Sequence, residues 1–274
     1  MLQKTLGPTG AQLITSLYNI GKTIFDVRDV EKLTGLRGNS ATDLASRLIK
    51  RNIIARIKPG KYVIIPQEIG DSTNYIGNWY VIAREIVNSR DYYVSHYSAM
   101  DLHNMVTHPV TTVYITTPKR EYSKRRFVGN TVYEFIYTNK QRIWGVTEIW
   151  VTRSEKVRVS DIEKTIVDCL YRPEYCGGII EITKGLWIQR GSIDFEKLRN
   201  YTLKFGKYVI IKRLGYILEN LNVVDSNYLR ELRIEINDEY YILDPLLSTE
   251  ERYKNSWKIV ANIGPKEIVN SVTT

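Results

Sequence analysis

The chain has 274 residues and a formal net charge of +9, with 43% hydrophobic and 25% charged residues. This is the composition of a globular protein, and it excludes wholesale disorder, collagen-like repeats and low-complexity sequence. Because the chain has no run of about 18 apolar residues, no signal peptide and only two cysteines, we expect a cytoplasmic protein that crosses no membrane.

The positive charge is concentrated near the start of the chain. Residues 1–66 contain 11 Lys and Arg and 4 Asp and Glu, a balance of +7, whereas the other 208 residues contain 28 and 26, a balance of +2. A basic segment of this kind is an electrostatic footprint for nucleic acid, although an anionic membrane surface would also attract it. The pattern of residues inside the segment favours one of these partners.

Three short helices are predicted in the basic segment. The first begins near Thr9, the second is capped by Asp26 and ends at Gly35, and the third runs from residue 39 or 40 to about residue 51. The apolar residues of the third helix recur at helical intervals and share one arc, which consists of Ala41, Leu44, Ala45, Leu48 and Ile49.

A hairpin is predicted directly after these helices. Residues 54–57 and 61–65 have strand patterns, and Lys58-Pro59-Gly60 between them is typical of a turn. Three helices followed by a basic hairpin predict a winged helix-turn-helix domain in residues 1–66. In that arrangement the third helix lies in the major groove and the hairpin contacts the adjacent backbone.

The polar arc of the third helix carries side chains that can contact DNA. Arg47 could pair with a guanine edge, Asp43 could accept from cytosine, and the hydroxyls could reach phosphates or bases. The neighbouring cations are expected to contact phosphates, which would make binding strongly salt-dependent. The predicted DNA-binding residues are Ser40, Thr42, Asp43, Ser46, Arg47, Lys50, Arg51, Arg56, Lys58 and Lys61.

Two other interpretations of this helix are open. The polar arc could be an ordinary solvated face, with Asp43 and Arg47 forming an i,i+4 ion pair. Winged helices also serve as protein-interaction modules. The attached hairpin and the concentration of charge favour DNA binding over both.

The rest of the chain has a mixed α/β pattern, so the fold class expected is α+β. We expect a domain over residues 67–190 and a helical and β lobe over residues 191–274, which could also form one domain together. Strands are predicted at 92–94, 111–116, 131–137, 147–152, 157–159, 233–236, 240–243 and 258–262. Helices are predicted at 79–87, 98–105, 194–205 and 209–221, with a further helix that a Ser160–Glu163 capping box opens and that ends before Pro173.

A second basic cluster lies in the loop between two predicted strands. It consists of Lys119, Arg120, Lys124, Arg125 and Arg126 around Tyr122. The cluster could be a solvated hairpin end. Alternatively, it could extend the nucleic-acid footprint, with Tyr122 stacking on a base.

Catalytic and metal-binding patterns are weak. His96, His103 and His108 lie close in sequence, but no cysteine or carboxylate stands at a zinc-like spacing, so a hydrogen-bonded His96 and a partly buried His103 are expected. Lys164 and Asp168 predict a plain i,i+4 pair with a partly buried carboxylate. We therefore expect no bound metal, no cofactor and no enzymatic activity.

Four stretches of the sequence form a recognisable set. They are residues 95–103, residues 159–170 with Pro173 and Gly177-Gly178, residues 212–219, and Leu243-Asp244-Pro245 with Trp257, Lys258 and Asn262. Together with the winged helix they resemble, in order and over almost the whole chain, the AbiEi family of antitoxins from type IV toxin–antitoxin (abortive infection) systems. Lys164, where many relatives carry Arg, and Met105 are mild departures.

The resemblance implies a transcriptional autorepressor that is also an antitoxin in viral defence. In the family, the winged helix binds operator repeats in double-stranded DNA, and the C-terminal part counteracts a nucleotidyltransferase-like toxin, mostly without a stable complex. Direct contact with the toxin therefore stays open. Such a toxin needs a Gly-Ser turn followed by an Asp-x-Asp pair, and no such pair follows Gly191-Ser192, so this chain resembles the antitoxin.

Two competing functions are a nuclease with a winged-helix targeting domain and a protein-interaction adaptor. A nuclease would need clustered carboxylates in the C-terminal part, and the sequence pattern assembles none. An adaptor would need an apolar outer face on the third helix, whereas that face is cationic and rich in hydroxyls.

Overall fold

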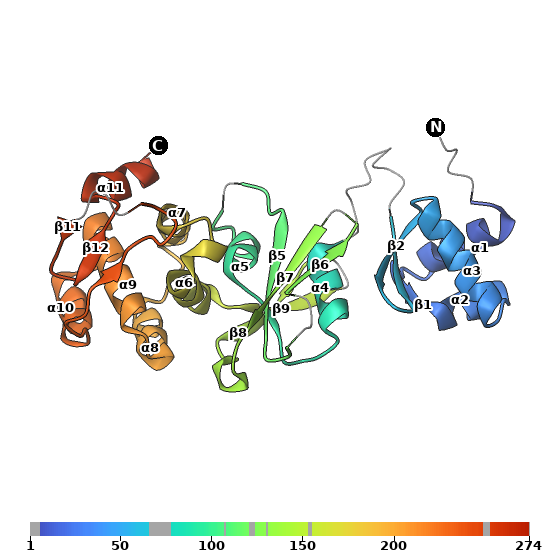
Figure 1. Ribbon diagram of the computed structural model, residues 1–274, viewed down its shortest axis with the longest axis horizontal. Helices are drawn as coiled ribbons and strands as arrows, with labels where there is room; N and C mark the ends of the chain where they lie inside the picture. Colours follow the sequence, from blue (N-terminus) through green and yellow to red (C-terminus); the bar gives the residue numbers. More distant parts are fainter. Residues whose placement is uncertain are drawn as a thin grey trace.

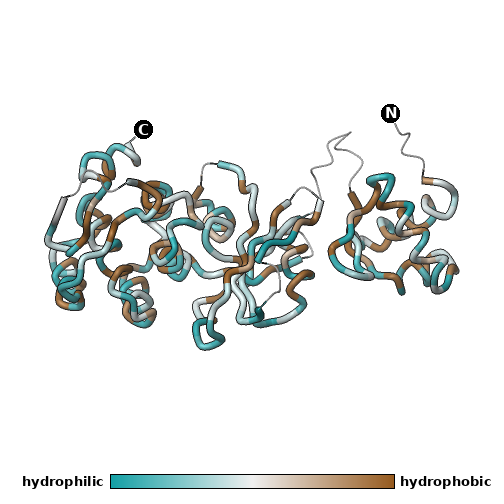
Figure 2. Tube along the Cα trace, in the orientation of Figure 1, coloured by the Kyte–Doolittle hydropathy of each residue, from teal (hydrophilic) through white to brown (hydrophobic). Residues whose placement is uncertain are grey.

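The computed structural model describes residues 6–65, 78–106, 108–120, 124–129, 131–152, 155–248 and 253–273. The chain forms an elongated structure in three parts (Figure 1): helices with a small sheet at the N-terminal end, a six-stranded sheet in the middle, and helices at the C-terminal end. Apolar segments run through all three parts (Figure 2). The predicted α+β class is therefore confirmed.

Residues 6–65 form three helices and three strands. The helices are α1 (Pro8–Asn19), α2 (Val27–Thr34) and α3 (Asn39–Lys50), and the strands are β1 (Ile24–Asp26), β2 (Ile54–Lys58) and β3 (Lys61–Ile64). β3 is the central strand and runs antiparallel to both β1 and β2. The three helices and the hairpin have nearly the predicted bounds, whereas β1 has no counterpart among the predicted elements.

Local sequence sets these boundaries. Asp26 caps α2 through a reciprocal capping box with Asp29, and Gly35 ends the helix in the left-handed conformation, as predicted. The predicted Thr9 cap of α1 is wrong, because Gly7 occupies the cap position and Pro8 is the first helical residue. Proline suits that position since its missing N–H would have no partner there.

The β2–β3 hairpin belongs to two hydrophobic clusters. Its side chains alternate between the two faces of the sheet. The face toward α1, α2 and α3 carries Ile54, Tyr62 and Ile64. The opposite face, which packs with helix α4 (Trp79–Val87), carries Ala55, Ile57 and Val63. The hairpin therefore joins the N-terminal unit to the central part of the molecule.

The central sheet has the strand order β6-β7-β5-β4-β9-β8. Its strands are β4 (Tyr93–Val94), β5 (Thr112–Thr117), β6 (Arg125–Val128), β7 (Thr131–Tyr137), β8 (Val146–Trp150) and β9 (Lys156–Ser160). β5 is parallel to β7 and β4 to β9, and the other pairs are antiparallel. Helix α5 (His96–Leu102) follows β4 and contacts β5, and the 3-10 helix η2 (Lys140–Arg142) follows β7.

The C-terminal part is mostly helical. It contains α6 (Ile162–Tyr171), η3 (Pro173–Tyr175), α7 (Ile179–Ile188), α8 (Phe195–Phe205), α9 (Tyr208–Leu221), α10 (Ser226–Ile234) and α11 (Pro265–Thr273). A small sheet of β10 (Tyr241–Ile242), β12 (Ile259–Ala261) and β11 (Tyr253–Lys254) packs with them. Gly215 of α9 lies against Trp257: a Cβ atom there would be 2.2 Å from the indole, so only glycine fits.

Several predicted C-terminal elements need correction. The strand expected at 233–236 is wrong, because Arg233 and Ile234 end α10 and residues 235–236 follow it. Helices α7 and α11 have no predicted counterpart. The capping box at the start of α6 is also wrong. Asp161 caps that helix by accepting from the Lys164 amide, and Glu163 instead accepts from the Asp194 amide. A carboxylate next to the helix start outcompetes the Ser160 hydroxyl, which is buried against Thr165.

Within the described residues, every helix is too short or too polar to cross a lipid bilayer.

Candidate nucleic-acid interface

Helix α3 has one buried and one exposed face. The buried face consists of Ala41, Leu44, Ala45 and Leu48. The exposed face consists of Asn39, Ser40, Thr42, Asp43, Ser46, Arg47 and Lys50. The amphipathic arrangement predicted for this helix is therefore confirmed, and all its predicted DNA-binding side chains point outward.

The charged side chains of this face have few intramolecular partners. Among the described residues, Asp43 and Arg47 form no ion pair with each other or with any other group, so the i,i+4 pair considered above is not present. The Thr42 hydroxyl donates to the Asn39 carbonyl at 2.8 Å and keeps its oxygen free to accept. Unpaired charge on an exposed helix face is available to a partner.

The hairpin cations are divided between two environments. Arg56 is exposed. Lys58 Nζ donates to the Glu85 carbonyl at 2.6 Å, and Lys61 forms an ion pair with the Glu85 carboxylate. We expected both Lys58 and Lys61 to contact phosphates, but in the structure they bind Glu85 and so attach the hairpin to α4. Arg56 is the hairpin cation that faces solvent.

Electrostatics at this junction follow from burial and from the crowding of charges. Burial lowers the pKa of Lys58, and the charges of Lys61, Arg126 and Lys119 lower it further, against the opposing effect of Glu85. Burial alone would raise the pKa of Glu85, but the hydrogen bond and charge of Lys61 lower it below its usual value. The junction therefore holds more positive charge than Glu85 neutralises.

The second basic cluster is split by the fold. Lys119 and Arg126 lie close enough to Lys58 to lower its pKa, and β2 contacts both α3 and β6. Lys124 and Arg125 instead form ion pairs with Glu134 on β7, at 3.3 and 2.8 Å. Two cations of the predicted second contact therefore lie beside the hairpin.

The other members of the second basic cluster add little to the positive charge beside the hairpin. The Arg120 guanidinium lies over the Tyr137 ring, 4.9 Å from its centroid. Tyr122, the proposed stacking residue, lies outside the described residues. The structure thus brings only part of the cluster to the hairpin, because successive residues of β6 point to opposite faces.

The histidines have structural partners. One ring nitrogen of His96 lies 2.9 Å from Ser95 Oγ, which fits the hydrogen-bonded role expected for it. His103 is partly buried, as expected, and its Nε2 lies 2.6 Å from the Ser160 carbonyl oxygen. In the part of the chain that the structure describes, no three His, Cys, Asp or Glu side chains gather closely enough to hold a metal ion.

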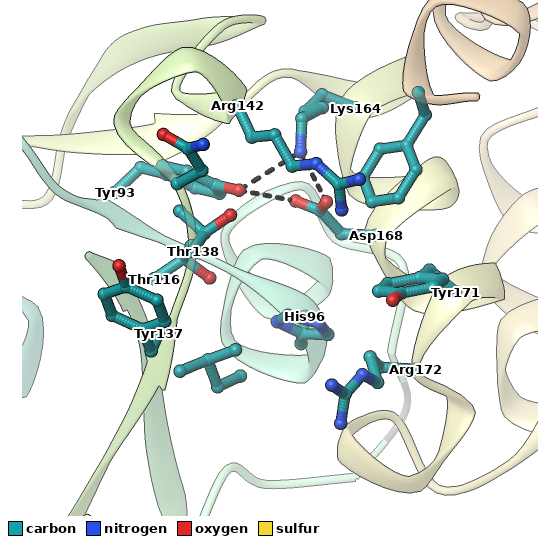
Figure 3. A pocket seen from close by; sticks show the side chains of 13 residues that line it. Tyr93, His96, Thr116, Tyr137, Thr138, Arg142, Lys164, Asp168, Tyr171 and Arg172 are labelled. Carbon is teal, nitrogen blue, oxygen red and sulfur yellow. Dashed lines mark hydrogen bonds and ion pairs between the residues drawn. The ribbon is translucent and has the colours of Figure 1, made fainter. Parts of the chain in front are cut away.

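The Lys164–Asp168 ion pair is present, but its surroundings could not be predicted. Both side chains are buried, and Tyr93 Oη donates to Asp168 and accepts from Lys164, each at 3.1 Å (Figure 3). His96 and Arg142 line the same pocket. No local sequence signal links the Lys164–Asp168 pair to Tyr93, His96 and Arg142, because those three residues come from other elements.

No known protein family matches the sequence, and no curated protein matches it. A solved structure, the RV2827C protein from Mycobacterium tuberculosis, has a similar fold, with a TM-score of 0.71 and 13% sequence identity. The match covers 97% of this chain and 95% of that one. At this identity the similarity concerns the fold alone, over nearly the full length of both proteins.

Proposed function

We propose that this protein binds double-stranded DNA through α3 and represses its own operon, as the antitoxin of a type IV toxin–antitoxin system. The observation that carries the proposal is the exposed face of α3. Its cations and hydroxyls point to solvent, and Asp43 and Arg47 have no ion-pair partner among the described residues.

The arrangement around α3 supports this proposal. Three helices, with a hairpin after the third, are the parts of a winged helix, in which the third helix reads the major groove. Buried residues on the inner arc of α3 hold the helix against α1 and α2, so its outer face is presented rigidly. A rigid face is what positioned contacts with base edges require.

The side chains of α3 match the chemistry of base and phosphate contacts. Arg47 can donate two hydrogen bonds to the O6 and N7 atoms of a guanine, and Asp43 can accept from the N4 of a cytosine. Lys50 at the end of α3 and Arg56 on the hairpin supply charge for phosphates. Lys119 and Arg126 extend that charge beyond residues 6–65.

The antitoxin part of the proposal rests on the resemblance of the sequence to the AbiEi family. If this part of the proposal holds, a neighbouring gene should encode a nucleotidyltransferase-like toxin. Growth arrest by that toxin should be relieved when this protein is expressed with it. A toxin whose arrest is unaffected by this protein would contradict the antitoxin assignment and leave DNA binding to be judged separately.

DNA binding is tested by fluorescence anisotropy with the DNA upstream of the protein's own gene and with a shuffled duplex of equal length. We expect the parent protein to prefer the upstream DNA, and Arg47→Ala to lose that preference. Arg230→Ala is the matched control, because Arg230 is an exposed arginine on the remote helix α10. Equal binding of both duplexes by the parent would contradict specific repression.

A further inference from the structure

A cavity of about 300 Å³ lies between the central sheet and the C-terminal helices (Figure 3). Thr116 and Ile136 line it from the ends of the parallel strands β5 and β7, where they stand in register. Lys164 and Asp168 of α6 line the opposite side. The carboxyl ends of parallel strands are a frequent place for ligands, and the volume is at the lower end for small-molecule sites.

The cavity carries an excess of positive charge. Its lining contains three basic side chains, Arg142, Lys164 and Arg172, and one carboxylate, Asp168. Asp168 is already committed to the ion pair with Lys164. A ligand that enters therefore meets cations in excess, and an anion is the ligand class they favour.

Arg142 is the least satisfied of these cations. Its guanidinium lies over the Phe205 ring, 4.7 Å from the centroid, and contacts no carboxylate among the described residues. Arg172 forms an ion pair with Glu174 at 3.3 Å and lies on the other side of the pocket. Two guanidiniums that flank one cavity can bind phosphate oxygens from both sides.

His96 adds a neutral hydrogen-bonding group. It is buried, and burial lowers its pKa to about 4, so the ring is uncharged at neutral pH. One ring nitrogen contacts Ser95 Oγ, and the other has no hydrogen-bond partner among the described residues. Its φ of 52° is left-handed, a conformation that costs energy for histidine and that often accompanies a functional position.

Aromatic rings complete the lining. Tyr137, Tyr171 and Phe205 border the cavity, and Tyr137 is 55% exposed. Flat rings of this kind stack on nucleobases. Beside Tyr137, Thr138 and Asn139 supply a hydroxyl and an amide that can bond to a base or sugar.

We infer that this pocket binds a nucleoside monophosphate, with the phosphate between Arg142 and Arg172 and the base against the tyrosines. A phosphate satisfies the excess positive charge, and a base accounts for the aromatic lining. The small volume favours one nucleotide over a longer chain. This inference does not depend on DNA binding by α3, which lies in the N-terminal part of the molecule, apart from β5, β7 and α6 (Figure 1).

The test is isothermal titration calorimetry of the full-length protein with the four ribonucleoside 5′-monophosphates, adenosine, ribose 5-phosphate and inorganic phosphate. At least one monophosphate should bind, and adenosine and inorganic phosphate should each bind at least about tenfold more weakly. Arg142→Ala should weaken the monophosphate at least about tenfold. Lys140→Ala is the matched control, since Lys140 is a neighbouring cation on η2 that pairs with Asp91 and does not line the pocket.

Three results would overturn the inference. If none of the monophosphates binds, the pocket does not bind a nucleoside monophosphate. If inorganic phosphate binds as tightly as the monophosphates, the pocket is not a nucleotide site. If Arg142→Ala and Lys140→Ala weaken binding equally, the ligand binds outside this pocket. The hydrogen bonds of the buried Lys164–Asp168 pair run between these two residues and Tyr93, so Arg142→Ala removes none of them.

Discussion

Lys61 on the hairpin and Glu85 on α4 form an ion pair that joins the N-terminal unit to the central part of the molecule. Arg84 contacts the same carboxylate at 3.2 Å. We expect Glu85→Ala to lower the free energy of unfolding by about 1 kcal/mol, because it leaves the partly buried Lys61 without its counter-charge, whereas Arg84 keeps its ion pair with Glu155. Urea denaturation would measure this. The exposed Glu148 of β8 offers a control, and an equal loss in Glu148→Ala would argue against the contribution of the pair.

The same ion pair should make stability depend on pH. Although burial alone would raise the pKa of Glu85, Lys61 lowers it in the folded protein. A lowered carboxyl pKa contributes stability that is complete above the unfolded value of about 4.3 and is lost as pH falls through the folded value. The difference in unfolding free energy between the parent and Glu85→Gln should therefore be steady near neutral pH and shrink below about pH 4. A difference that persists unchanged into acid would contradict this.

The split of the second basic cluster predicts unequal effects on DNA binding. Replacing Lys119 and Arg126 with serine should reduce the slope of log affinity against log salt by about 1 to 2, since each lost phosphate contact removes about 0.9. Replacing Lys124 and Arg125 should change the slope less, because both pair with Glu134, whose carboxylate offsets one of their two charges. Anisotropy titrations over a salt series would compare the pairs. Equal salt slopes for the two double variants would contradict the prediction that Lys119 and Arg126 contribute more to DNA binding than Lys124 and Arg125.

The buried ion pair on α6 should be costly to break on one side only. Asp168→Ala leaves the Lys164 ammonium buried with a single tyrosine oxygen, and we expect a loss of about 3–5 kcal/mol in unfolding free energy. Replacing both residues together, Lys164→Met with Asp168→Leu, should cost clearly less. Chemical denaturation of the three variants forms the comparison. A double variant as unstable as Asp168→Ala would contradict the view that the loss comes from leaving the buried Lys164 charge unpaired.

Gly215 should tolerate no side chain. Gly215→Ala places a methyl group inside the Trp257 ring, so we expect a loss of at least about 3 kcal/mol and a lower melting temperature. The control is Gly191→Ala, where an added Cβ meets no atom within 4 Å. Calorimetry on both variants would test this. Equal melting temperatures would contradict the packing described around Trp257.

The sequence predicted elements best where local signals agreed. For α3, a polar residue at the helix start and the helical spacing of the apolar residues pointed to the same structure. For α10, the alternation Arg233-Ile234-Glu235-Ile236 suggested a strand, but the Asp225 cap and the buried Tyr228 and Leu232, four residues apart, determine a helix. A four-residue alternation was outweighed by a pattern over nine residues.

The two candidate sites differ in how far the sequence reveals them. The DNA-facing residues lie on one helix, so their spacing alone placed them together. The pocket unites Tyr93 and His96 with Arg142 and Asp168, which come from four separate elements. The same limit applies to Lys58 and Lys61: their charge was evident, but their partner Glu85 lies 27 and 24 residues further along the chain. Only the tertiary fold determines such partners.

The two-faced hairpin has a consequence for dissecting the molecule. A fragment ending at residue 66 would contain every element of the N-terminal unit, yet it would expose Ala55, Ile57 and Val63, which are buried in the intact chain. Such a fragment would be less soluble and less stable than its secondary structure suggests. Unfolding of residues 6–65 and loosening of α4 should be linked events, with one cooperative transition where two independent ones would otherwise be expected.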